Sequence, residues 1–433
     1  MFQQTIAQLL DGRYPDPDGG PDIGVDCRAV IVSDSLEGAE ADLIGSLDVG
    51  RVLALVMDEN TRKALGNRIQ QRIASSFETV PMVLPGRPHA DGETVDRLRQ
   101  LGRDADAFIA VGSGTINDLC KYASALDGKP YAVFPTAPSM NGYTSANAAI
   151  TIEGHKKSLA AVMPRGVFID LGVLSKAPKR MICSGLGDSI CRSTAQADWL
   201  LSHLLFGTSY RTAPFQLLAP YEGELLRSAS SLVQGDLAAM KLLACTLVMS
   251  GFGMTICGGS YPASQGEHLI SHYIEMMAGE GLPESFHGEQ IGVTTLSMAA
   301  LQEHILAMDS VRVRPTQVTE EGVKSHFGAQ LGESCWRDFQ AKKMDADAAA
   351  GLQRTIDARW DEMRHQLKEV SRPTAELRTA LEQGGCPLRP EDLGWPDGFY
   401  RDAIVHSREI RDRYTFLDLA GDAGLLETFH PSP

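Results

Sequence analysis

The chain has 433 residues, of which 43% are hydrophobic and 22% charged, and its formal net charge is −15. This composition is that of an ordinary soluble globular protein. The length exceeds what one hydrophobic core usually organises, so we expect two domains. The acidic balance argues against a nucleic-acid partner, because binding to phosphates needs a basic face.

Neither a membrane span nor a secretory signal is predicted. No stretch approaches 18 uninterrupted apolar residues, and the first twenty residues lack a basic region followed by a long apolar one. The eight cysteines form no Cys-x-x-Cys pair, which argues against a thiolate zinc site or a redox pair. We therefore expect a cytoplasmic protein without membrane insertion, whose reduced thiols are mostly small core residues.

The first part of the chain alternates strand-like and helix-like segments. Apolar runs predict strands at 28–32, 52–57, 107–111, 131–134 and 167–169, and helical patterns cover 61–77 and the stretch that ends at residue 126. Residues 148–152 and 158–162 flank Glu153-Gly154-His155 and predict a β-hairpin. This order predicts an α/β domain built on a mostly parallel sheet with helices on both faces.

From about residue 176 the pattern becomes helical. β-branched runs grow scarce, and long amphipathic stretches predict an all-helical domain. The boundary is expected near Ala177-Pro178, which gives domains 1–177 and 178–433. The amphipathic stretches are 184–206, 212–233, 236–256, 264–278, 288–306 and several between 346 and 425.

A glycine-containing turn follows the predicted strand 107–111. It reads Gly112-Ser113-Gly114-Thr115-Ile116-Asn117-Asp118 and leads directly into a helix. Glycines let the backbone approach a pyrophosphate, and the helix N-terminus offers free N–H groups. The turn lacks the full Gly-x-Gly-x-x-Gly pattern, so an ordinary tight turn capped by Thr115 stays an equal alternative.

Two further segments lie at the carboxyl ends of predicted strands, which is where ligands bind in open α/β folds. Asp58 closes the strand 52–57, where an acidic residue binds ribose hydroxyls and repels a 2′-phosphate. Glu59 adds charge, so NAD(H) is favoured over NADP(H); the alternative for Asp58 is a helix N-cap. The loop Pro135–Ser145 follows the strand 131–134 and is rich in hydroxyl groups, which favours ligand binding over a simple connection.

A metal constellation is spread over the helical half and its boundary. His268 and His272 are four residues apart and so share one helix face, while Asp188 and His287 lie in Gly-Asp and His-Gly-Glu contexts. Imidazole and carboxylate together suit Zn²⁺, Fe²⁺ or Ni²⁺, and three protein ligands leave a position for a substrate oxygen. Such a metal acts as a Lewis acid that helps a substrate hydroxyl to form an alkoxide.

Together these motifs resemble the glycerol-1-phosphate dehydrogenases of the iron-containing alcohol dehydrogenase and dehydroquinate-synthase-like superfamily. The likeness is greatest to the bacterial type associated with arabinose operons, and it extends to the C-terminal segment 410–418 (IRDRYTFLD). It implies an α/β dinucleotide-binding domain, an all-α metal-binding domain, an active site in the cleft, and a homodimer. The implied reaction interconverts sn-glycerol 1-phosphate and glycerone phosphate, so the partner is a small phosphorylated polyol or ketone.

The resemblance also assigns roles to individual residues. Asp188, His268 and His287 would bind one divalent metal, Zn²⁺, Ni²⁺ or Fe²⁺. His272 would contact the substrate and pass protons to solvent. Lys121 and Lys156 lie in segments that resemble the active-site surroundings, where either would meet a phosphate unless it is a solvated surface charge. The dinucleotide would be bound by Asp58, Gly112, Ser113, Gly114, Thr115, Asp118, Thr136, Ser139 and Ser145.

One position departs from the family pattern. Asn141 stands where the family has a substrate-facing Asp, and an amide keeps hydrogen-bonding capacity but loses the charge and any role as a base. This departure motivates one alternative, a dehydrogenase for another polyol, aldehyde or phosphonate. Two more stay open on other grounds: a cyclase like dehydroquinate synthase, whose chemistry the same superfamily supports, and a binding protein that kept the fold.

Overall fold

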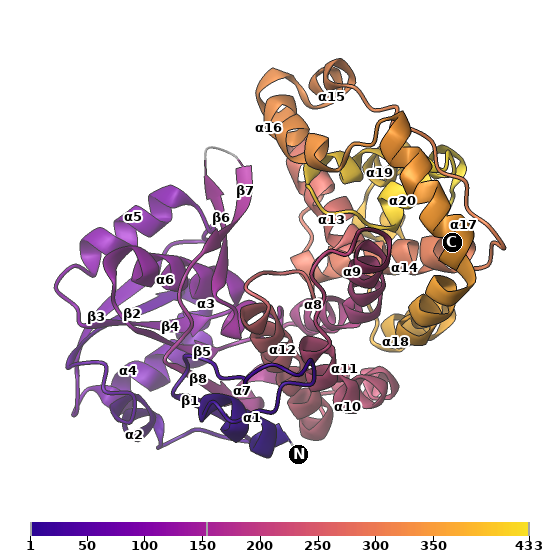
Figure 1. Ribbon diagram of the computed structural model, residues 1–433. Coiled ribbons are helices and arrows are strands. Elements are labelled where there is room, and N and C mark those ends of the chain that lie inside the picture. The colour runs from indigo at the N-terminus through magenta and orange to yellow at the C-terminus, as the bar shows by residue number, and fades with distance from the viewer. Residues whose placement is uncertain (1, 153–154, 432–433) are drawn as a thin grey trace. The chain divides into compact units, whose positions relative to one another are not determined.

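The computed structural model describes residues 2–152 and 155–431 and divides into two compact units (Figure 1). Unit 1 comprises residues 1–189 and 212–260, and unit 2 comprises 190–211 and 261–433. The two compact units group residues 212–260 with the first part of the chain. These units are defined by contacts and do not test the domain boundary expected near Ala177-Pro178, which stays a prediction.

Unit 1 is built on a six-stranded sheet with the order β1-β8-β5-β4-β2-β3, in which every pairing is parallel. The predicted strands are all present, and the structure adds one that the sequence analysis missed, β3. Its sequence, ETVPMVL, begins with polar residues and contains Pro81, and only two of its residues, Met82 and Leu84, are buried. The strands are β1 (Ala29–Ser33), β2 (Val52–Asp58), β3 (Glu78–Leu84), β4 (Ala107–Gly112), β5 (Tyr131–Pro135) and β8 (Gly166–Asp170).

Helices cover both faces of this sheet (Figure 1). Alternate residues of β2, Leu53, Leu55 and Met57, share one core with Ile44 of α2 and Ile69 of α4. Figure 1 shows α5 and α6 on the opposite face. The helical segments between residues 2 and 174, apart from the turn η2 described below, are α1 (Phe2–Leu10), α2 (Glu40–Gly45), α3 (Glu59–Thr61), η1 (Arg62–Gly66), α4 (Asn67–Ile73), α5 (Gly92–Leu101), α6 (Gly114–Asp127) and α7 (Leu171–Leu174).

The predicted hairpin is present as β6 (Asn147–Ile152) and β7 (His155–Ala160), which pair antiparallel. Its Glu153 and Gly154 lie outside the described residues. The side chains of His155 and Lys156 are also outside the description, so the role expected of Lys156 stays a prediction. The turn η2 (Gly142–Thr144) precedes this hairpin.

Four helices complete unit 1: α8 (Lys179–Ile190), α10 (Ala213–Arg227), α11 (Ala229–Val233) and α12 (Leu237–Ile256). Among the described residues, α12 alone is long and apolar enough to cross a membrane by length and composition. However, 78% of its most apolar stretch is buried within the protein. Burial of this kind is typical of a core helix in a large soluble domain.

Unit 2 is helical, as predicted, around one core that includes Ile270, Met298, Trp360 and Phe416. The structure divides the expected helix 184–206 between α8 and α9, and it adds α15 and α16, which the sequence analysis missed. The elements are α9 (Arg192–Phe206), α13 (Gly266–Met277), η3 (Gly279–Gly281), α14 (His287–Leu306), α15 (Glu320–Phe327), α16 (Ala329–Phe339), η4 (Gln340–Lys342), α17 (Ala346–Val370), α18 (Thr374–Gln383), η5 (Pro390–Leu393), α19 (Asp397–His406), η6 (Ser407–Ile410), α20 (Phe416–Asp422) and η7 (Leu426–Thr428).

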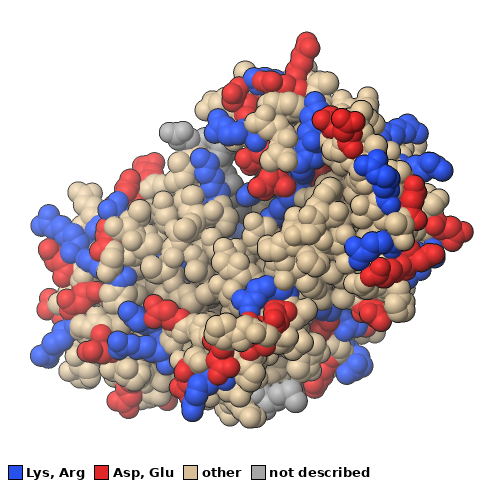
Figure 2. Space-filling view, viewed as in Figure 1, with Lys and Arg blue, Asp and Glu red and all other residues tan. Residues whose placement is uncertain are grey.

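Charges of both signs are spread over the surface. Lys and Arg are interspersed with Asp and Glu on the face that Figure 2 shows, although acidic residues predominate in the chain as a whole. Six of the eight cysteines are buried, which confirms the prediction that most of them are small core residues.

Candidate metal and dinucleotide sites

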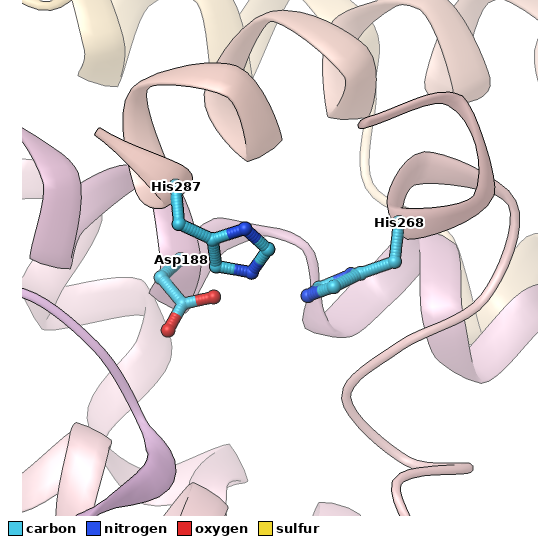
Figure 3. Close-up of side chains that lie close together, drawn as sticks. All are labelled: Asp188, His268 and His287. Atoms are coloured by element: carbon cyan, nitrogen blue, oxygen red, sulfur yellow. The ribbon is translucent and has the colours of Figure 1, made fainter. Parts of the chain in front are cut away.

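Three of the predicted metal ligands come together. Asp188 lies in the last turn of α8, two residues before unit 2 begins, His268 lies in the first turn of α13, and His287 is the first residue of α14. Their ligand atoms all lie within 4.8 Å of one another. Figure 3 shows the carboxylate and the two imidazole rings turned toward a common space.

The donor set fits a divalent transition metal. One carboxylate and two imidazoles are the ligands that Zn²⁺, Fe²⁺ and Ni²⁺ accept, and three protein ligands leave coordination positions for a further oxygen. The Nδ1 atom of His287 is buried and has no hydrogen-bond partner among residues 2–152 and 155–431. A carboxylate oxygen of Glu275 is 3.9 Å from this nitrogen. A buried nitrogen without a hydrogen-bond partner is costly.

A third histidine extends the cluster. The ring centroid of His272 lies 5.9 Å from that of His268 and 6.1 Å from that of His287, and the last two are 5.1 Å apart. The four-residue spacing on α13 places His268 and His272 on one helix face, as the sequence predicted. The three imidazoles therefore form one group.

The first turn of α13 is fixed by close packing and by a buried carboxylate. A Cβ atom on Gly266 would lie 2.4 Å from the Cε of Met298 and 2.8 Å from a carboxylate oxygen of Asp198. That oxygen accepts a hydrogen bond of 2.9 Å from the backbone N–H of Gly266. Burial, together with the charge of Glu267, raises the pKa of Asp198 to about 8. A side chain at Gly266 would therefore have to displace Met298 and Asp198 where α13 begins.

Asp188 is held from the other side by the loop Pro135–Ser145. The backbone N–H of Asn141 donates to its Oδ2 at 2.7 Å, and the hydroxyl of Ser184 donates to the carbonyl of Ser139 at 2.9 Å. The loop lies directly on α8, because a Cβ on Gly185 would lie 1.6 Å from the carbonyl oxygen of Pro138.

The side chain of Asn141 itself has an open donor. The residue is only 9% exposed, and its Nδ2 atom has no hydrogen-bond partner within the described part of the chain. A buried amide N–H without an acceptor costs about 1–3 kcal/mol. This group is therefore available to a ligand that brings an acceptor oxygen to the vicinity of Asp188.

The glycine-containing turn lies at the carboxyl end of β4, in the middle of the parallel sheet. Ser113 is the N-cap of α6, and its side chain makes no capping bond, so the first N–H groups of a 14-residue helix keep their capacity to bind an anion. A Cβ on Gly112 would lie 2.5 Å from the Cβ of Ile116. Thr136 of the next strand end donates its backbone N–H to the carbonyl of Gly112 at 3.2 Å.

Asp58 has the structural role that the sequence left as its alternative. Its carboxylate accepts hydrogen bonds from the backbone N–H groups of Asn60 and Thr61 at 2.7 and 2.8 Å, and Thr61 completes a capping box. The residue still lies at the carboxyl end of β2, where a ribose would be bound. An N-cap and a ribose contact use different oxygens of one carboxylate, so the two roles are compatible.

Lys121 is neither a surface charge nor placed to meet a phosphate. Its side chain is fully buried, and its ammonium donates to the carbonyls of Gly142 and Asn147 at 2.5 and 3.0 Å and to the hydroxyl of Ser145 at 3.0 Å. Burial lowers its pKa to about 8, against the opposing effect of Asp118, whose carboxylate lies 3.8 Å away. Lys121 thus ties the loop to α6 from within.

Two residues at this site were missed from the sequence, Glu267 and Asp198. Both carboxylates are fully buried next to the start of α13. The only sequence signal was an acidic residue immediately before His268, which is common on any helix. Their partners come from distant segments: Thr194 donates to Glu267, and the backbone N–H of Phe416 donates to Asp198 at 2.9 Å.

A doubly covered parallel sheet with a glycine-containing strand-to-helix turn, together with an Asp-His-His group at the ends of three helices, is typical of metal-dependent, nucleotide-linked oxidoreductases. Comparison with known families agrees: residues 31–178 match the model of the iron-containing alcohol dehydrogenases. The cofactors of this family are NAD(P) and a divalent metal.

The chain belongs to the glycerol-1-phosphate dehydrogenase family. It is 36% identical to the glycerol-1-phosphate dehydrogenase [NAD(P)+] of Halalkalibacterium halodurans, over 84% of this chain and 85% of that one. It is also 32% identical to the protein of the same name from Bacillus subtilis, over 86% and 85% of the two chains. The resemblance drawn from the motifs is thereby confirmed.

Solved structures show the same fold at low sequence identity. A probable glycerol dehydrogenase from Sinorhizobium meliloti superposes with a TM-score of 0.60 at 16% identity, covering 93% of this chain and 97% of that one. The glycerol dehydrogenase of Schizosaccharomyces pombe gives a TM-score of 0.52 at 19% identity, covering 79% and 91%. The predicted fold class, an α/β region followed by a helical one, is confirmed.

Proposed function

We propose that this protein is a metal-dependent, NAD(P)-linked oxidoreductase that interconverts sn-glycerol 1-phosphate and glycerone phosphate. The observation that carries the proposal is the Asp188-His268-His287 group, whose ligand atoms lie within 4.8 Å of one another. It occurs in a chain that is 36% identical to a glycerol-1-phosphate dehydrogenase. The same group argues against a degenerate binding protein, since a protein without catalysis has no use for three converging ligands.

In this proposal Asp188, His268 and His287 hold one divalent metal, Zn²⁺, Ni²⁺ or Fe²⁺. When bound, the metal supplies Lewis-acid stabilisation to the oxygen of the substrate at the carbon that is oxidised or reduced. His272 contacts the substrate and passes a proton between its hydroxyl and solvent, a role supported by its ring centroid lying about 6 Å from those of both metal-binding histidines.

The nicotinamide cofactor is assigned to the carboxyl edge of the sheet in unit 1. The turn Gly112–Asp118 and the α6 N-terminus hold the pyrophosphate, and Asp58 faces the adenosine ribose, so NAD(H) is preferred over NADP(H). The cofactor is also contacted by Thr136, Ser139 and Ser145, which lie in the loop Pro135–Ser145. Because the hydroxyl of Ser145 already accepts from Lys121 at 3.0 Å, Ser145 supports the loop as well as contacting the cofactor.

Asn141 contacts the substrate with its open amide N–H, and Lys156 is the proposed phosphate contact on the hairpin. The amide favours a second candidate function, a dehydrogenase on the same scaffold for another phosphorylated or phosphonate carbonyl compound. The observation behind it is that Nδ2 is a buried donor at a position where the family has an acceptor, so a substrate with an additional acceptor oxygen would be bound better there. We also propose a cytoplasmic homodimer.

A substrate panel tests both candidates. The metal-loaded protein is assayed by oxidation of NADH and NADPH with glycerone phosphate, glyceraldehyde 3-phosphate, dihydroxyacetone and a phosphonate ketone, and the product of the first is assigned by its stereochemistry. The highest kcat/KM for glycerone phosphate, with sn-glycerol 1-phosphate as product, supports the proposal. A kcat/KM at least tenfold higher for another compound supports the second candidate.

The Asn141→Asp variant adds a specific check. It restores the family residue without changing the size of the side chain. If Asn141 sets the substrate preference, the variant shifts the ratio of kcat/KM values between glycerone phosphate and the other carbonyl compounds. An unchanged ratio would mean that Asn141 does not contact the substrate.

A further inference from the structure

Glu267 is a buried carboxylate in direct contact with His268. Its side chain is fully buried on the first turn of α13. Its Oε1 accepts from the backbone N–H of Gln265 at 2.8 Å and lies 2.9 Å from Nδ1 of His268. Its Oε2 lies 3.2 Å from the hydroxyl of Thr194, which shares its proton between Glu267 and the carbonyl of Cys191 at 2.8 Å. All of these residues belong to unit 2.

This geometry fixes which nitrogen of His268 carries the proton. A carboxylate can only accept, so Nδ1 must be the N–H donor in the 2.9 Å contact. Nε2 then carries the lone pair, and this is the tautomer that binds a metal through Nε2. A carboxylate that holds the far nitrogen of a metal-binding histidine also orients the ring and raises its basicity.

We propose that Glu267 is a positioning residue that holds His268 in the tautomer and orientation required for metal binding. The proposal rests on the metal site of the proposed function and adds a residue that does not itself touch the metal. Glu267 in turn is held by Thr194 of α9, so the position of the metal ligand depends on a segment more than seventy residues earlier in the chain.

The C-terminal segment supports the same turn. Arg413 donates to the carbonyl of Ser264, which lies just before α13, and its guanidinium lies 4.4 Å from the ring centroid of Tyr261. The backbone N–H groups of Phe416 and Gly266 both donate to Asp198. The loop that leads into α13 is thus held at Ser264 by Arg413 and at Gly266 by Asp198.

A different arrangement of the same residues must be separated from this one. Cys191, Glu267 and His268 also place their ligand atoms within 4.8 Å of one another, which would make Glu267 a metal ligand. Against this, Oε1 of Glu267 is already shared by two N–H groups. The two arrangements predict different effects for Cys191, because only the second uses its thiol.

The chain offers a matched control for Glu267. Glu409 is also buried, and its Oε1 lies 3.0 Å from Nδ1 of His406, so this pair in the same unit has nearly the same oxygen–nitrogen distance. His406 lies against His326, with ring centroids 3.7 Å apart, and is not part of either candidate metal group. Glu267→Gln and Glu409→Gln therefore make the same chemical change at a metal-binding and a non-metal-binding histidine.

The experiment measures the affinity of the full-length apo-protein for Co²⁺ alone, by competition with a chromogenic chelator and by the visible absorption of the bound ion. We expect Glu267→Gln to weaken Co²⁺ binding about 10- to 100-fold and to change the absorption spectrum. Glu409→Gln and Cys191→Ser should bind within about twofold of the wild type, since neither residue contacts His268 in the proposed arrangement.

Unchanged Co²⁺ affinity in Glu267→Gln would overturn the proposal, and so would an equal loss in Cys191→Ser, which would make Glu267 a ligand. If Glu267→Gln fails to fold, Thr194→Val is measured instead, and the absence of any weakening there would also overturn it. Because no substrate or nicotinamide is present, this assay can succeed even if the proposed reaction is wrong.

Discussion

Polar residues behave differently in the two units. At the carboxyl edge of the sheet in unit 1, two polar side chains bond to the protein itself: the half-buried Asp58 caps a helix, and the buried Lys121 binds two carbonyls and a hydroxyl. In unit 2, the rings of His268, His272 and His287 gather within about 6 Å of one another, and the Nδ1 of His287 has no partner among the described residues. Internally satisfied groups hold a site in shape, whereas converging, incompletely satisfied groups bind the ligand.

The largest effect is expected from removing a converging group. His287→Ala removes a proposed metal ligand, and because a Lewis-acid metal contributes several kcal/mol, kcat/KM should fall on the order of 100-fold or more. Steady-state kinetics checks this, together with NADH binding, which should be unchanged. His304→Ala, at the other and exposed end of α14, is the control. Full activity in His287→Ala would show that His287 is not a metal ligand needed for the reaction.

Removing an internally satisfied group should instead cost stability. Lys121→Met leaves the carbonyls of Gly142 and Asn147 without their ammonium donor, and we expect the free energy of unfolding to fall by about 2–4 kcal/mol. Denaturant unfolding measures this loss. Lys129→Met is the control, because Lys129 also donates to two carbonyls but is only half-buried. An equal loss in both variants would contradict a special role for Lys121.

Asp58 tests whether one residue can serve both purposes. Asn caps a helix as well as Asp does, so Asp58→Asn should change the free energy of unfolding by less than about 0.5 kcal/mol. Loss of the charge should nevertheless shift the ratio of kcat/KM for NADH over NADPH toward NADPH. An unchanged ratio would leave Asp58 with the cap alone.

The smallest effect concerns a histidine of unit 2 outside the metal group. Burial and the neighbouring His406 lower the pKa of His326, while Glu409 and Asp402 oppose the shift, and the hydroxyl of Tyr273 lies 2.8 Å from its Nε2. A histidine whose pKa is lower in the folded protein disfavours folding once it is protonated. The free energy of unfolding should therefore fall as the pH drops from about 6.5 toward the folded pKa.

His326→Gln should make that decline shallower, because Gln does not titrate. The exposed His365→Gln serves as its control. Urea unfolding at a series of pH values measures both, and identical pH profiles for His326→Gln and the wild type would show that His326 does not contribute.

The sequence predicted the elements whose signal is local. Continuous apolar runs located β2, β4 and β5 because a parallel strand buried on both faces has no polar side, and the i, i+4 spacing placed His268 and His272 on one helix face. By contrast, β3 carries a proline and a half-exposed pattern, and it was missed.

Long-range support for the site could not be read from the sequence. Glu267 acquires its role from Thr194, and Asp198 from Phe416, which lies 218 residues further along the chain. Lys121 shows the same limit, because a lysine on a predicted helix gave no sign that its ammonium would be enclosed by a loop more than twenty residues away. Only the folded chain brings these partners together.

The central claim is that the converging Asp188-His268-His287 group makes this chain a metal-dependent glycerol-1-phosphate dehydrogenase. The most direct test strips the protein with a chelator and follows NADH oxidation with glycerone phosphate during titration with Zn²⁺, Ni²⁺ or Fe²⁺. We expect negligible activity in the stripped protein and recovery that saturates at one metal ion per chain. Full activity after complete removal of the metal, or none with any of the three ions, would contradict it.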